Sequence, residues 1–173
     1  MLRFVGLLNA AVWLGAMCFF NFVIGPTFFS DEVKNLLTLP RAGAAAQIMV
    51  ERYLVLQQWC AGIALAHLLA EWLYNQGRMF PRAALIVLIG CLGISLAGSR
   101  LLAPQMKQLH LVKYAVQTTP EQKAAAARSF AILHGTSQVT NLLALLGVLY
   151  YYWKLSVGGQ GSRTGTGTGR FRP

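Results

Sequence analysis

Four long apolar runs dominate this sequence and restrict its fold more than any other feature. Each run is almost free of charged residues. A helix needs roughly 20 consecutive apolar residues to cross the hydrocarbon core of a bilayer. Because lipid offers the backbone no hydrogen-bond partners, spanning runs of this kind are expected to be helical. The sequence therefore predicts an all-α membrane protein with four transmembrane helices in an antiparallel bundle, at residues 4–24, 53–73, 83–101 and 131–153.

The composition agrees with a membrane location. Hydrophobic residues make up 55% of the 173 residues and charged residues only 12%, whereas an ordinary soluble domain has about a quarter charged residues. The net charge of +10 arises from 15 basic and 5 acidic residues. The basic residues lie between and beyond the apolar runs, so membrane lipids rather than nucleic acid are the expected partner. The three cysteines lie inside apolar runs, and their spacing predicts neither a disulfide nor a metal site.

The number of spans and the basic residues together predict the orientation. An even number of spans places both termini on one face, which we call side A, together with the Asn75–Arg82 loop; the opposite face is side B. That loop is short, contains Arg78 and Arg82 and has no acidic residue, and such loops are retained in the cytoplasm. We therefore predict cytoplasmic termini. Residues 1–156 are predicted to form the transmembrane domain, and the basic Gly/Thr-rich residues 157–173 a disordered tail.

Helix-start signals predict structure outside the membrane on side B. Ser30 precedes two acidic residues and is expected to cap a short helix, which Pro40 ends before the second long helix begins. Thr119-Pro120-Glu121-Gln122 has the pattern of a capping box, so the fourth helix is expected to begin near Pro120, outside the lipid. Between residues 106 and 116, apolar residues recur at helical spacing. This pattern fits a helix that either lies on the membrane surface or extends the third span.

Polar side chains interrupt the apolar runs, mostly toward side B. At 1.5 Å of rise per residue, antiparallel helices bring these groups to similar depths in the membrane. We expect them to face one another inside the bundle, where they stabilise its packing. The alternative is a polar pocket for a small ligand or ion, with Arg100 and His134 as its ionisable members. This polar set comprises Asn21, Gln57, Gln58, Ser95, Ser99, Arg100, His134, Ser137, Gln138 and Asn141.

Two further patterns concern helix surfaces. His67 and Glu71 are four residues apart on the second helix, which predicts a hydrogen-bonded pair near side A and supplies too few ligands for a metal. Small residues four apart predict close approach between helices. They occur at Ala11 and Gly15 on the first span and at Gly93 and Ala97 on the third.

Three stretches resemble the transmembrane-protein-205-like family. They are WLGAMCFFNFVIGPTFF (Trp13–Phe29), LPRAGAAAQIMVERY (Leu39–Tyr53) and FAILHGTSQVTNLL (Phe130–Leu143). The most specific parts are Gly-Pro-x-x-Phe after the first span and Phe-x-x-Leu-His before the fourth. The likeness covers nearly the whole chain except the tail. It implies four spans with a long loop between the third and the fourth. The bacterial members carry a domain of unknown function, so the resemblance implies a bacterial inner membrane and no agreed biochemical activity.

Several classes of function remain open at this point. The favoured one is a structural, partner-binding or lipid-associated bundle, with a membrane-protein partner or a second copy of itself. Transport of a small solute or ion through the polar set is the first alternative, and a haem- or copper-associated protein is the second. His67 and His134 differ in depth by about 15 Å, too far for one iron. We expect no enzyme and no cofactor, because paired acids, a Ser-His-Asp set and a phosphate loop are all missing from the sequence.

Overall fold

The computed structural model describes residues 1–74 and 82–157, and every regular element in these ranges is helical. The elements are α1 (Leu2–Phe19), the π-helical turn η1 (Phe20–Ile24), α2 (Gly25–Thr27), α3 (Asp31–Tyr74), α4 (Arg82–Ala97), the π-helical turn η2 (Gly98–Leu102), α5 (Ala103–Tyr114) and α6 (Pro120–Val157). The predicted loop at 75–81 and the predicted tail from residue 158 onward lie outside the described residues.

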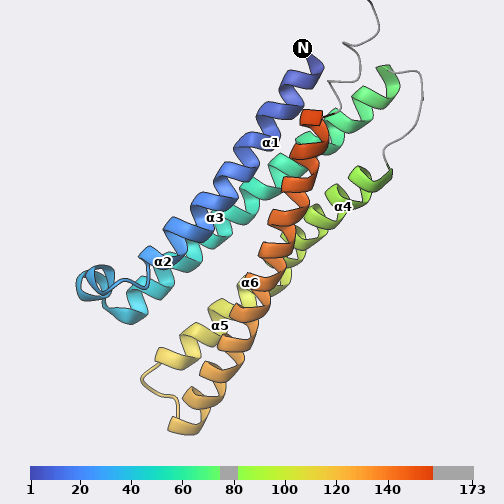
Figure 1. The fold of residues 1–173 in the computed structure, drawn as a ribbon. Coiled ribbons are helices and arrows are strands. Elements are labelled where there is room, and N and C mark those ends of the chain that lie inside the picture. The colour runs from blue at the N-terminus through green and yellow to red at the C-terminus, as the bar shows by residue number, and fades with distance from the viewer. Residues whose placement is uncertain (75–81, 158–173) are drawn as a thin grey trace, which may run out of the picture.

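The long helical segments run alternately up and down, as Figure 1 shows. Four segments are long and apolar enough to cross a membrane, namely Leu2–Thr27, Asp31–Tyr74, Arg82–Tyr114 and Pro120–Val157. α1 packs against α3 and α6, and α4 packs against the same two helices, so the four spans close into a ring. The predicted antiparallel four-helix membrane bundle is confirmed.

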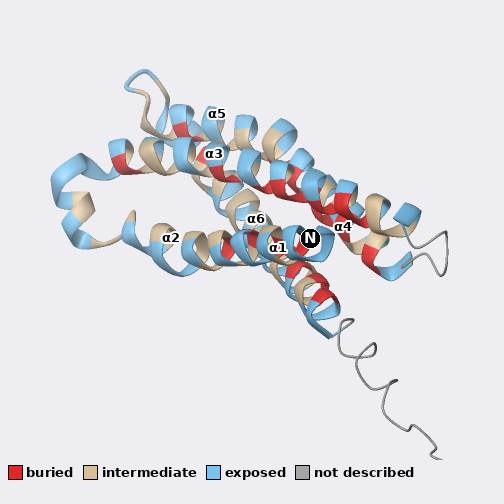
Figure 2. Cartoon of the chain, turned by 90° about the horizontal axis from the view of Figure 1, so that it is seen from above, coloured by how far each residue is buried: buried red, intermediate tan, exposed pale blue. Residues whose placement is uncertain are grey.

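The buried residues lie on the parts of the helices that face one another (Figure 2). Trp13 of α1, Leu88 of α4 and Tyr151 of α6 are almost completely buried in this core. Large apolar side chains such as Phe22 and Ile132 remain exposed on the outer surface. An apolar exterior of this kind is what lipid tails cover in a membrane, since they are as apolar as the side chains themselves.

Each π-helical turn ends two residues before a proline. Pro26 and Pro104 have no backbone N–H, so the carbonyl four residues earlier loses its usual helical donor. In η1 the N–H of Gly25 bonds instead to the carbonyl of Phe20, five residues earlier, and the residue before Pro104 repeats this bond in η2. The wider turn lets each helix continue past its proline. The helix of the first span therefore runs past its predicted end at the Gly-Pro pair.

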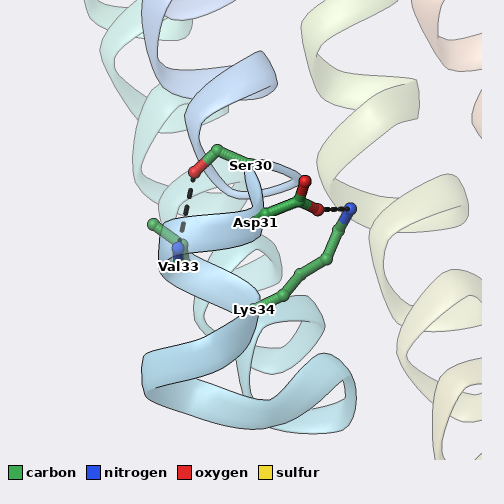
Figure 3. Close-up of polar contacts among 4 residues, drawn as sticks. All are labelled: Ser30, Asp31, Val33 and Lys34. Carbon is green, nitrogen blue, oxygen red and sulfur yellow. Dashed lines mark hydrogen bonds and ion pairs between the residues drawn. The ribbon is translucent and has the colours of Figure 1, made fainter.

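The predicted cap at Ser30 is confirmed. The Ser30 hydroxyl accepts a hydrogen bond from the N–H of Val33 at 3.4 Å (Figure 3). In the same turn, Lys34 Nζ lies 3.3 Å from Asp31 Oδ1. Serine at the N-cap and acidic residues in the first turn both stabilise the start of a helix.

A break follows this first stretch of α3. Thr38 has φ 60° and ψ 152°, the one positive φ among the described non-glycine residues. Such a conformation strains any residue with a Cβ, and here it redirects the chain two residues before Pro40. A short helix therefore precedes the long span, as the sequence predicted.

The capping box at the start of α6 also forms. The Thr119 hydroxyl accepts a hydrogen bond from the N–H of Gln122 at 3.3 Å, and Gln122 Oε1 accepts one from the N–H of Thr119 at 3.1 Å. On the preceding segment, α4, η2 and α5 form one continuous rod from Arg82 to Tyr114. Of the two interpretations of residues 106–116, extension of the third span is therefore correct.

The small-residue patterns on α1 and α4 do not mediate packing within the bundle, so that prediction is wrong. Gly15 and Gly93 are exposed, and a Cβ built on either would meet nothing within 4 Å. Close approach occurs at other glycines instead. A Cβ at Gly6 would collide with the ring of His67, and one at Gly147 would meet side chains of α4 at 3.1 Å. The helix faces that contact one another are set by the whole core and not by this motif.

The first turn of α1 is joined to the last turn of α6 on side A. Arg3, in the first turn of α1, donates hydrogen bonds to the carbonyl oxygens of Leu155 at 2.7 Å and Ser156 at 3.0 Å. Carbonyls in the last turn of a helix have no partner within that helix, and a cation there also complements the helix dipole. The first turn of the chain thus caps the C-terminal end of α6.

Candidate functional site

One amide joins three helices in the side B half of the bundle. Asn141 of α6 donates from Nδ2 to Asn21 Oδ1 at 2.7 Å, and its Oδ1 accepts from Tyr53 at 2.8 Å and from Gln57 Nε2 at 3.1 Å. Asn21 in turn donates to the carbonyl oxygen of Met17 at 2.8 Å. We call Asn21, Tyr53, Gln57 and Asn141 the Asn141 network. It brings together three members of the predicted polar set.

Tyr53 belongs to this network although the sequence analysis did not place it in the polar set. It lies four residues before Gln57, so the two side chains share one face of α3, and this spacing is the signal that could have found it. Its ring stacks on Phe20 of η1 with the centroids 4.0 Å apart. The π-helical turn therefore contributes both the stacking ring and Asn21. Tyr53 and Gln57 are 7% and 2% exposed, whereas Asn21 and Asn141 are half-buried.

A second and separate contact holds three other members of the polar set. Gln58 Nε2 donates to Ser99 Oγ at 2.8 Å and to the carbonyl oxygen of Ser95 at 3.3 Å. Ser95 is fully buried, and its hydroxyl donates to the carbonyl of Leu92 in its own helix. These bonds join α3 to α4 and η2, whereas the Asn141 network joins η1 of the first span to α3 and α6. The predicted polar set is therefore divided between two helix interfaces.

The remaining members of the polar set do not join either group through a described hydrogen bond. Arg100 in η2 and Gln138 in α6 are exposed. Ser137 is half-buried, and its carbonyl oxygen accepts a hydrogen bond from Thr140 within α6. The one cation of the set is thus on the outer surface and not at the centre of the bundle.

His134 lies in an aromatic contact instead of a polar one. Its ring is stacked on Phe130 of α6 with the centroids 6.1 Å apart, and it forms an edge contact with Phe29, whose centroid is 6.3 Å away. The ring centroid of His110 from α5 lies 6.3 Å from that of Phe130. Phe130 is thus in contact with both histidine rings on side B.

The predicted His67–Glu71 pair has a different geometry. His67 is 4% exposed, and its Nδ1 lies 3.5 Å from the hydroxyl of Tyr151 in α6. Its ring packs against Gly6 of α1, where no side chain stands in the way. Glu71 is half-buried one turn further along α3. The imidazole therefore contacts α1 and α6 across the bundle.

Two buried polar atoms beside the Asn141 network have no hydrogen-bond partner. They are the indole Nε1 of Trp13 on α1 and the Oε1 of Gln57 on α3. Two contacts set the register of these helices: the ring stack of Phe20 on Tyr53, and the 3.0 Å hydrogen bond from Asn9 Nδ2 to the Cys60 carbonyl oxygen. Trp13 and Gln57 lie between these contacts, at nearly the same depth at 1.5 Å per residue. A bridging water is the usual partner of such buried atoms.

The chemistry of these groups is that of neutral amides and hydroxyls. They donate and accept hydrogen bonds, but they provide no pair of titratable groups arranged for acid–base catalysis. Among residues 1–74 and 82–157, no group of three or more His, Cys, Asp or Glu side chains is placed to hold a metal ion. The arrangement is suited to holding helices together.

The fold and the neutral buried network define a polytopic helical membrane protein. The chain belongs to the family described as Domain of unknown function (DUF4149), which matches residues 8–115. The matched region runs from α1 to the end of α5, so α6 and Asn141 lie beyond it. No curated protein and no solved structure gives a significant match to the chain.

Proposed function

We propose that this protein is a non-enzymatic, membrane-embedded bundle that acts by binding lipids or a membrane partner through its outer surface. In this proposal the buried polar groups hold the helices in register and do not form a route for solutes. The observation that carries it is that Asn141 uses both its donor and its acceptor on the helices around it.

The position of the charged and titratable groups supports this function over transport. Intramembrane sites for ions or protons are usually built around buried ionisable side chains that face a cavity. Here Arg100 is exposed and His134 is stacked on Phe130. The buried His67 contacts Gly6 and Tyr151. The interior groups of the Asn141 network are neutral amides and a hydroxyl, which are common means of joining membrane helices.

Flux measurements on the full chain in proteoliposomes test the proposal. We expect proton entry, driven by a potassium gradient with valinomycin and followed with pyranine, to equal that of protein-free liposomes. We expect the same equality for glycerol entry followed by osmotic swelling. A flux above this background that is lost in Asn141→Leu, Arg100→Gln or His134→Ala, and retained in Thr140→Ala, would contradict the proposal and favour transport.

The haem- or copper-associated alternative requires ligands that converge, and the histidines are spread through the bundle. His67 contacts Gly6 and Tyr151 toward side A, whereas His110 and His134 each contact Phe130 on side B. One haem iron cannot join sites at opposite ends of a span about 30 Å thick. An absorbance spectrum of the purified chain tests this point, and a Soret band would support the haem-associated alternative.

We also propose that the protein lies in a bacterial inner membrane with both termini in the cytoplasm. We further propose that it is related to the transmembrane-protein-205-like family. Two of the three stretches that resemble that family lie within the matched region.

Orientation is tested by replacing Lys113 on side B or Lys154 on side A with cysteine. We expect a membrane-impermeant maleimide to label Lys113→Cys in intact spheroplasts, and Lys154→Cys only after lysis. The reverse pattern would invert the topology.

A further inference from the structure

Gln138 is a polar side chain on the outer surface of the last span. It is exposed and has no hydrogen-bond partner among the described residues. The stretch from Ser129 to Trp153 contains no Asp, Glu, Lys or Arg. Within it, Gln138 lies about 15 Å along α6 from Arg128, so the amide cannot reach headgroups at the level of that arginine. An amide without a partner in hydrocarbon is costly, and a second polar group has to meet it there.

The residues around Gln138 form one outward side of α6, which we call the Gln138 face. They follow one another at spacings of three, four or seven residues and so share one side of the helix. A Cβ built on Gly135 would meet nothing within 4 Å, and the other members are exposed. Small residues at one end of the face let another helix approach closely. The face comprises Ala131, Gly135, Gln138, Leu142 and Leu149.

The charge pattern of this face fits a second copy of the chain. Copies of one chain enter the membrane with the same orientation, so a symmetric pair has its two-fold axis along the membrane normal. Residues close to such an axis meet their own counterparts at the same depth. A glutamine suits this arrangement because its amide both donates and accepts, and can therefore bond to an identical amide. With no charged residue between Ser129 and Trp153, two copies meet here without like-charge repulsion.

The other exposed faces with small residues lack this complementarity. On α4, Gly93 and Ala97 share one side of the helix with the exposed Arg100 of η2. A parallel pair through that side would bring two like charges together. On α1, the exposed residues around Gly15 are apolar, and none of them needs a hydrogen-bond partner. The Gln138 face is therefore the surface that a second copy fits best.

We propose that two copies of the chain pair through the Gln138 faces of parallel α6 helices, with Gln138 Nε2 of each copy donating to Gln138 Oε1 of the other. The inference rests on the proposed function, because it identifies the membrane partner as a second copy of the chain. Asn141 keeps its bonds within each bundle, so the pairing uses an amide that the fold leaves free.

Energy transfer between donor-labelled and acceptor-labelled full-length chains in liposomes, at increasing dilution with lipid, tests this inference. We expect the wild-type chains to associate, with transfer that falls at high dilution. Gln138→Leu removes two symmetric hydrogen bonds and should weaken the association about tenfold or more. Gly135→Leu should weaken it as well, because the added side chain keeps the two helices apart. It should leave the bundle folded, since a side chain at Gly135 meets open space.

Two matched controls should associate as the wild type does. Thr136→Val removes a hydroxyl that bonds to the carbonyl oxygen of Ile132 within α6 and lies outside the Gln138 face. Gly15→Leu adds the same bulk to an open position on α1. In a Cys18→Ser background, oxidation with copper phenanthroline should crosslink Leu142→Cys into a dimer and leave Thr136→Cys as a monomer.

Wild-type transfer no greater than that of chance encounters would overturn the inference, and would leave lipid or a different membrane protein on the Gln138 face. So would a Gln138→Leu chain that associates as wild type does, or a loss of association in Gly15→Leu and not in Gly135→Leu. Circular dichroism melts confirm that each variant is folded. Solute flux above background contradicts the proposed function without changing the energy transfer, so the two failures are distinguishable.

Discussion

Replacing Asn141 with alanine is expected to lower the free energy of unfolding more than any other single change in the polar set. Three interhelical hydrogen bonds end on this one side chain, to Asn21, Tyr53 and Gln57. At roughly 0.6–1.7 kcal/mol for each bond inside a membrane, the expected loss from the three bonds is about 2–5 kcal/mol. Reversible unfolding of the full chain in mixed micelles, with increasing SDS, measures it.

Thr140→Ala is the matched control, because the Thr140 hydroxyl bonds only to carbonyl oxygens of its own helix in the described contacts. Its effect should stay within about 0.5 kcal/mol, as for substitutions that break no interhelical contact. Asn21→Ala, which removes one bond of the network, should fall between the two. If Asn141→Ala and Thr140→Ala were equally mild, the network would not be what holds α1, α3 and α6 in register.

A leucine at Gly6 is expected to destabilise the bundle by overpacking it. A Cβ at this position already collides with the ring of His67, which is 4% exposed and has Tyr151 on its other side. Extra atoms in a filled core cost about 1–3 kcal/mol. The same SDS titration should therefore show a lower midpoint for Gly6→Leu and a nearly unchanged one for Gly15→Leu, because a side chain at Gly15 meets open space.

A double-mutant cycle separates collision from other causes. If the His67 ring is what Gly6 must accommodate, then Gly6→Ala should be much less harmful in a His67→Ala background than in the wild-type chain. Additive effects would contradict this explanation. They would show that the glycine is needed for a backbone conformation or for packing against another side chain.

Local signals in the sequence were sufficient for most of the fold. The caps at Ser30 and Thr119 act within four residues of themselves, so their effect does not depend on the rest of the chain. Hydrophobic length likewise predicts a span without knowledge of its neighbours. The π-helical turns were missed, although each could have been suspected from a proline inside an otherwise apolar helical segment, at Pro26 and Pro104.

The candidate site was harder to predict because depth and rotation are separate quantities. Rise per residue predicts depth, and members of the polar set on different spans do lie in the side B half. Rotation about the helix axis depends on packing across the whole core. Gln57 and Gln58 are adjacent, so they point about 100° apart on a helix with 3.6 residues per turn. One therefore bonds to α6 and the other to α4 and η2.

The position of Asn141 on the last span also affects how the protein is made. Membrane segments emerge from the ribosome in order, so α1 and α3 are already in the bilayer before α6 is complete. Until then Asn21, Tyr53 and Gln57 have no Asn141 to bind, and Arg3 has no α6 end to cap. The Asn141 network therefore forms only after α6 has entered the bilayer. A nascent chain that stops before α6 leaves Asn21, Tyr53 and Gln57 without this partner in lipid, where an unsatisfied polar group is costly.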